Sequence, residues 1–207
     1  MATVAFPADQ APILLEEAAR RLRGAPGLGG LTLVTGGDPD DVYPVPRHDQ
    51  FVDDFGEPID YLHGGDIEEI ANALIATEAP ELRHASHARI RYLWRRQGGG
   101  SHGRVVLGRC HRASGMLRYW ADCDFVISLS ADHLRDMQAT AYQVEALVYH
   151  ELLHITTDMY GRLTLRGHDW EGFVLEILRY GLWKADLEQI GDAVQQLRLD
   201  LGDGARP

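Results

Sequence analysis

Residues 148–158, VYHELLHITTD, contain two histidines four positions apart, His150 and His154, with Glu151 directly after the first. If this segment is helical, the two imidazoles lie one turn apart on the same side and can point at one metal ion. The glutamate lies on the adjoining strip, where its carboxylate can take a proton from a water molecule that attacks a carbonyl carbon. The H-E-x-x-H spacing is therefore typical of a zinc metallopeptidase helix. The alternative is an ordinary helix whose histidines are partly solvated or bonded to local carbonyls.

A catalytic zinc site uses three protein ligands and one open position, so a third ligand must come from elsewhere in the chain. The metzincin spacing is excluded, because Thr157 and Tyr160 stand where that pattern has glycine and histidine. We predict that His168 is the third ligand, because a short hairpin after the helix could return it to the metal. Asp169 beside it could orient a ligand imidazole, although either residue could instead cap the next helix. The alternatives that stay open for the third ligand are Asp158, Glu171 and Glu176.

Four further residues are weaker candidates for a functional role. Tyr160 and Arg166 could donate hydrogen bonds to an oxyanion, but packing or surface exposure is the more common role for such residues. Cys110 and Cys123 are too few for a disulfide scaffold and do not form a CxxC pair. We expect both thiols to be buried and inert.

Composition and charge argue against several classes of protein. The chain has 207 residues, of which 45% are hydrophobic, and a formal net charge of -11. The length suffices for one core, and the charge argues against nucleic-acid binding, which needs clustered lysine and arginine. No apolar stretch approaches the roughly 20 residues of a membrane span, and the first residues do not resemble a secretory signal. We therefore expect a cytoplasmic protein with no nucleic-acid or membrane partner, while its oligomeric state stays unknown.

The elements that must position the histidines can be predicted from periodicity. A T-x-x-Q capping box predicts that a helix begins after Thr140. The histidines lie on a strip turned away from the apolar face that we expect to be buried. That apolar face carries Val144, Val148, Leu152 and Ile155.

Alternating apolar residues predict strands around this helix. Residues 88–96 form a first strand, with 104–110 as its candidate hairpin partner, and 124–130 form a third strand. A short strand, 162–166, follows the helix. Further helices are expected at 11–24, at 66–77 with Asp66 as N-cap, and at 184–199, whereas 24–65 is mostly loop.

Three segments together resemble the putative phage metallopeptidase family: ADCDFVISLS, VEALVYHELLHI and GRLTLRGHDWEGFVLEILRYGLW. The most specific part is Y-H-E-L-L-H with a downstream H-D-x-E-x-F, and the likeness covers residues 86–183. It implies an α+β, minimal zincin-like fold, with a small mixed or antiparallel sheet packed on the active-site helix. It also implies Zn²⁺ held by His150, His154 and His168, with Glu151 as base, in a protein encoded by a phage or prophage and acting in the host cytoplasm.

The predicted organisation has three parts. Residues 1–85 form an N-terminal extension of helix and loop, 86–183 a zincin-like metallopeptidase domain, and 184–207 a C-terminal helix and tail. The predicted function is zinc-dependent hydrolysis of a peptide or protein, with the substrate lying along strand 124–130 as the sheet edge.

Three other functions are kept as alternatives. The protein could be a catalytically idle zinc-binding module that contacts a host or phage protein. It could be a zinc hydrolase of another amide, such as one in peptidoglycan. It could also resemble SprT-type proteases, which cut DNA-bound proteins, but the acidic balance counts against this.

Overall fold

The computed structural model describes residues 33–101 and 104–168, and four positions beyond them, Glu176, Arg179, Tyr180 and Trp183. The chain divides into two compact units, one of residues 27–168 and one of residues 1–26 with 169–207. In the second unit, the indole N–H of Trp183 donates a 2.6 Å hydrogen bond to the carboxylate of Glu176. The helices predicted at 11–24 and 184–199 lie outside the described residues, and the predicted boundaries at residues 85 and 183 stay predictions.

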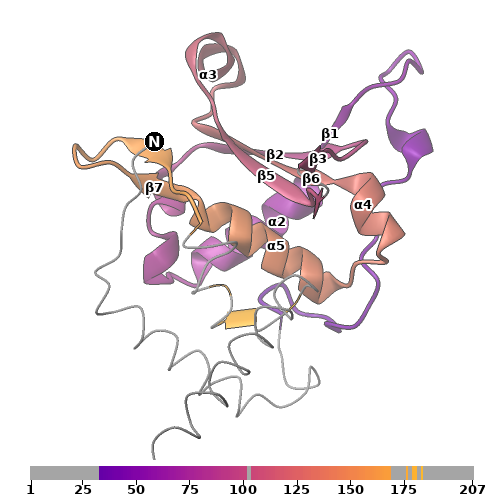
Figure 1. The fold of residues 1–207 in the computed structure, drawn as a ribbon, viewed down its shortest axis with the longest axis horizontal. Helices are drawn as coiled ribbons and strands as arrows, with labels where there is room; N and C mark the ends of the chain where they lie inside the picture. The colour runs from indigo at the N-terminus through magenta and orange to yellow at the C-terminus, as the bar shows by residue number, and fades with distance from the viewer. Residues whose placement is uncertain (1–32, 102–103, 169–175, 177–178, 181–182, 184–207) are drawn as a thin grey trace, which may run out of the picture. The chain divides into compact units, whose positions relative to one another are not determined.

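A mixed four-stranded sheet organises the unit of residues 27–168 (Figure 1). Its order is β1–β2–β6–β5, in which β2 and β6 are parallel and the two outer pairs are antiparallel. The predicted α+β class with a small mixed sheet is confirmed. The strands are β1 (Tyr61–His63), β2 (Ile90–Arg95), β6 (Phe125–Ser130) and β5 (Gly108–Arg112).

The middle of the sheet is where the apolar sequence is densest. Phe125, Ile127 and Leu129 of β6 are fully buried, and Ser128 and Ser130 on the other side of the strand are buried as well. A strand that is covered on both faces needs neighbours on both edges, so β6 takes a central position. The expectation that residues 124–130 form the sheet edge is therefore wrong, because the edges are β1 and β5.

The predicted hairpin between residues 88–96 and 104–110 is also wrong. β5 pairs with β6 and not with β2, because β6 lies between them. The connecting segment instead forms its own small hairpin, β3 (Gly100–Ser101) with β4 (Arg104–Val105). Closeness in sequence favoured pairing of residues 104–110 with residues 88–96. In the structure, the buried strand β6 takes the place between them.

Helices α2 and α5 lie on one face of the sheet (Figure 1). α2 (Gly65–Ala76) begins after Gly64, so the expectation that Asp66 is its N-cap is wrong. The carboxylate of Asp66 instead accepts hydrogen bonds from the indole N–H of Trp94 at 2.8 Å and the hydroxyl of Tyr43 at 3.1 Å. The first bond ties the start of α2 to strand β2, and the second ties it to the segment before η2.

Helix α5 (Ala141–Leu153) starts with the predicted capping box of Thr140 and Gln143. Every residue from Val144 to Leu153 is buried, so this helix is covered on all sides and not only on its apolar stripe. It ends at Leu153, before the last residue of the predicted apolar face. Ile155, which was predicted on the helix face, is the first residue of β7 (Ile155–Thr157), which pairs with β8 (Leu163–Leu165).

The remaining elements are short. Helix α3 (Gly115–Ala121) follows β5 and projects away from the layer of α2 and α5 (Figure 1). Helix α4 (Ala131–Asp136) follows β6, and three 3₁₀ turns are η2 (His48–Gln50), η3 (Pro80–Leu82) and η4 (Ala85–His87). Within the described part of the chain, no helix has the length and apolar character needed to cross a membrane.

Candidate metal centre

The last turn of α5 carries the two histidines of the motif. His150 lies within the helix and is 6% exposed, while His154 is its C-cap residue and is partly exposed. Their ring centres are 5.2 Å apart. The one-turn spacing predicted from the sequence therefore places both imidazoles side by side, and the burial of α5 limits their freedom.

The hairpin β7–β8 returns the chain to this pair and brings His168 to it. The Nε2 atoms of His168 and His150 are 3.0 Å apart, and the ring centres of His168 and His154 are 4.6 Å apart. One nitrogen from each of the three rings can be chosen so that all three lie within 4.8 Å of one another. His168 thus joins the two motif histidines although it follows His154 by 14 positions in the sequence.

The turn of this hairpin is stabilised by Asp158. Its carboxylate accepts hydrogen bonds from the backbone N–H groups of Tyr160 and Arg162 at 2.9 and 3.0 Å, and from the Arg162 guanidinium at 2.8 Å. The bond from the Arg162 backbone is the largest cause that lowers the pKa of Asp158. Gly161 takes a left-handed conformation, with φ of +74°, which glycine adopts without steric cost.

The same hairpin orients the ring of His154. The Nδ1 atom of His154 lies 2.9 Å from the carbonyl oxygen of Arg166, and the Arg166 N–H donates to the His154 carbonyl at 2.7 Å. Because a carbonyl can only accept, Nδ1 must carry the proton, and the lone pair of the neutral ring is then on Nε2. A backbone acceptor that selects the tautomer of an imidazole in this way is typical of metal ligands.

Glu151 lies beside these rings and is only 2% exposed. Its Oε2 atom is 3.9 Å from Nε2 of His154. On its other side lies the edge strand β5, where a Cβ added to Gly108 would be 2.5 Å from Oε1 of Glu151. Sequence reasoning missed Gly108, because nothing in the segment RVVLGRC shows that the strand passes a carboxylate.

Two of the other candidates for third ligand, Asp158 and Glu176, lie among the described residues. Asp158 is engaged in the hairpin turn, and the carboxylate of Glu176, in the other compact unit, accepts the bond from Trp183. Glu171 lies outside the described residues, as does Asp169. Of the residues that the structure describes, the group that could hold a metal comprises His150, His154 and His168.

The remaining candidate side chains have more ordinary surroundings. Tyr160 is 73% exposed at the hairpin turn, where the Arg162 guanidinium lies 5.1 Å from its ring centre. Arg166 acts on His154 through its backbone, which was not anticipated, and the oxyanion role of its side chain stays a prediction. Both cysteines are free thiols, and burial raises the pKa of each.

The three imidazoles fit a metal by their chemistry and spacing. Zinc binds histidine nitrogen at about 2.0–2.1 Å in tetrahedral geometry, which requires neighbouring nitrogens about 3.3 Å apart. The spacing of 3.0 Å between the Nε2 atoms of His150 and His168 is within a few tenths of an ångström of this value.

Comparison with known proteins identifies the family of this chain. The family model described as putative phage metallopeptidase matches residues 59–196. The chain belongs to this family. Searches of curated proteins and of solved structures returned no match.

Membership supports a metallopeptidase, with a peptide or protein as substrate and a metal in the site. The histidine group is where the described part of the chain could bind that metal. The match begins at residue 59. The matched region therefore includes β1 and α2 together with the other strands of the sheet.

Proposed function

We propose that this protein is a zinc-dependent metallopeptidase in which His150, His154 and His168 hold the metal and Glu151 is the general base. The observation that carries the proposal is the convergence of three imidazoles, from two separate segments, next to a buried carboxylate. Three protein ligands with one open position are the usual arrangement of catalytic zinc, and three histidines are one such ligand set. A zinc ion in such a site supplies Lewis-acid activation of water and polarises a carbonyl group.

The residues of the chain would divide the remaining work. Glu151 accepts the proton of the attacking water and then delivers it to the amine that leaves. The carbonyl of Arg166 keeps the proton of His154 on Nδ1, so that Nε2 can bind the metal. The extended substrate adds as a strand to β5, the edge strand that passes Glu151 at Gly108. β5 thus takes the role that the sequence had assigned to residues 124–130.

The test combines metal analysis with peptide hydrolysis. Purified protein is expected to contain about one zinc per chain and to cleave members of a broad peptide library, with activity lost to a chelator and restored by zinc. Glu151→Gln should keep the zinc and lose hydrolysis, because it removes the base and leaves the ligands. Full turnover by that variant, or stoichiometric zinc in a His150→Ala, His154→Ala double variant, would refute the assignment.

A catalytically idle zinc-binding module is the second candidate. Helix α3 favours a role in binding another protein, because its residues Met116, Tyr119 and Trp120 are 76–79% exposed. Zinc in the purified protein without hydrolysis of any peptide would support this function.

The family description supports a phage or prophage origin. We also propose that the protein acts in the host cytoplasm. The absence of nucleic-acid and membrane partners stays a prediction.

A further inference from the structure

A recess lies at the C-terminal end of the edge strand β5, next to α3 and the β7–β8 hairpin. It has a volume of about 240 Å³, and its apolar walls are Ala113, Phe125 and Leu163. Three arginines line it as well, Arg112 from β5, Arg118 from α3 and Arg162 from the β7–β8 turn. In a chain with a formal net charge of -11, three arginines around one recess are a local exception.

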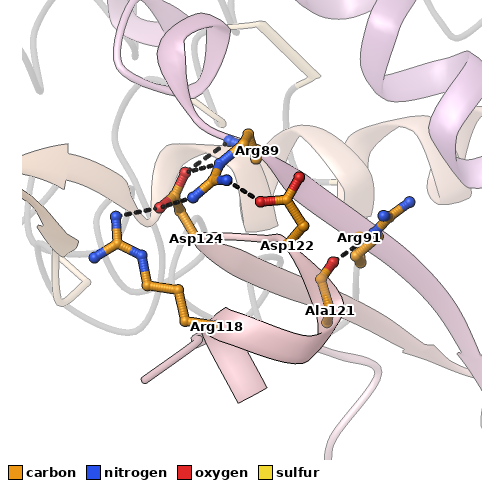
Figure 2. A network of polar contacts seen from close by, with 6 residues as sticks. All are labelled: Arg89, Arg91, Arg118, Ala121, Asp122 and Asp124. Carbon is orange, nitrogen blue, oxygen red and sulfur yellow. Dashed lines mark hydrogen bonds and ion pairs between the residues drawn. The ribbon is translucent and has the colours of Figure 1, made fainter. Parts of the chain in front are cut away.

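One acidic residue, Asp124, also lines the recess, and the arginines around it keep its carboxylate ionised (Figure 2). Arg118 forms an ion pair with it at 2.7 Å, and Arg89 binds it through three nitrogens at 3.1–3.2 Å. These contacts lower the pKa of Asp124 to about 2, with the side-chain hydrogen bond from Arg89 as the largest cause. Arg89 also pairs with Asp122. Asp124 therefore positions Arg118 and is itself fully engaged.

The other two arginines differ in what they contact. Arg162 pairs with Asp158 at 2.8 Å, and 70% of its side chain stays accessible. The side chain of Arg112 is exposed and makes no hydrogen bond or ion pair with any residue in the described part of the chain. Arg112 is thus a cation beside apolar walls without an anion of its own, which suits a carboxylate ligand.

The position of Arg112 connects this recess to the candidate metal centre. Side chains alternate along a strand, so Arg112 lies on the same face of β5 as Gly108, the residue that contacts Glu151. Four residues of strand separate the two positions by about 13 Å. A peptide that adds antiparallel to β5 runs from the Arg112 end toward Gly108, so its residues near Arg112 precede those near Glu151.

We propose that the recess lined by Arg112, Arg118 and Arg162 is a substrate subsite that binds a carboxylate of the peptide, from an Asp or Glu side chain about four residues N-terminal to the cleaved bond. This inference rests on the proposed function for the direction of the peptide and the place of cleavage. The subsite makes the enzyme selective for acidic sequences. The apolar walls accommodate the methylene groups of the side chain while the arginines bind its oxygens.

The test measures peptide binding separately from cleavage. Fluorescently labelled peptides with one Glu moved through each position, and matched Gln peptides, are bound to the Glu151→Gln variant and followed by anisotropy. Glu is expected to bind about tenfold or more tighter than Gln at one position, as for a hydrogen bond to a charged group. The preference for Glu over Gln should vanish in Arg112→Ala.

Arg109→Ala is the matched control. It removes the same charge from the same strand, but Arg109 lies on the opposite face, near Arg95 and Gly99, and does not line the recess. This variant should keep the preference for Glu. Equal loss in Arg109→Ala and Arg112→Ala would mean that general charge attraction is responsible, and it would overturn the subsite.

Two further comparisons decide what a negative result means. Peptides with free and amidated C-termini test the other source of a carboxylate, and a preference that depends on the free C-terminus would overturn the assignment to a side chain. Wild-type protein that cleaves Glu and Gln peptides equally would refute the subsite while the proposed function stands. Selective binding of Glu peptides without any cleavage would refute the peptidase and support the subsite.

Discussion

Replacing Gly108 with alanine tests whether the edge strand β5 and Glu151 form one catalytic unit. The φ angle of Gly108 lies outside the left-handed region, so alanine is compatible with the backbone and the effect comes from contact alone. The new Cβ would be 2.5 Å from Oε1 and 3.1 Å from Cδ of Glu151, and 3.1 Å from Cδ2 of Leu129. An ordinary contact needs about 3.4 Å, so the carboxylate or the strand must move by roughly 0.5–1 Å.

The size of the expected effect follows from this displacement. Glu151 and Leu129 are buried, at 2% and 0% exposure, so neither can swing into solvent without disturbing the core. Overpacking of this kind costs about 1–3 kcal/mol of stability, and a shift of about 1 Å in a catalytic group costs about 10²-fold in rate. We therefore expect Gly108→Ala to lower kcat/KM by about 10²-fold while the zinc content is unchanged.

The assay compares kcat/KM on a peptide substrate, zinc content and the free energy of unfolding. Gly99→Ala is the control, because its Cβ would meet only the ends of the Arg109 and Arg95 side chains, at 3.6 and 3.7 Å. The stability cost should also shrink in a Glu151→Ala background, which removes the clashing carboxylate. Activity within about twofold of wild type, or an undiminished cost in that background, would refute the reasoning.

Three further predictions concern the core and the metal. Asp124→Asn should destabilise the protein by about 1 kcal/mol, a value discounted for solvent screening of half-exposed arginines. Because the folded pKa, about 2, is below the ordinary 3.8, the contribution is present above about pH 4 and is lost as the pH falls toward 2. Unfolding curves between pH 2 and 5 should show this loss in wild type and not in the variant. Thr140→Ala should cost about 1 kcal/mol in chemical denaturation, since it removes the cap of α5, and an unchanged midpoint would contradict the capping role. Zinc should raise the Tm of metal-free wild-type protein and have a much smaller effect on His168→Ala, because binding to the folded state alone stabilises it; equal shifts would exclude His168 as a ligand.

The sequence was sufficient for features that depend on local spacing. The i, i+4 relation of His150 and His154 and the capping box at Thr140 follow from the geometry of a single helix. The alternation of apolar and polar residues in β2 and the apolar run of β6 likewise identified strands, since burial of a strand produces a recognisable pattern of apolar residues. The resemblance to the family rested on the same motif segments, and the family match confirmed it.

Only the tertiary structure decided which strands are neighbours and what surrounds the motif. Strand order depends on which strand is covered on both faces, a property of the whole core, so β6 took the centre and β5 became the edge. For the same reason no local signal could show that Gly108 contacts Glu151, or that the carbonyl of Arg166 orients His154. The sequence by itself determined which residues are able to do chemistry, whereas long-range packing determined which of them meet. The reason is that a contact between distant segments produces no repeating residue pattern in either segment.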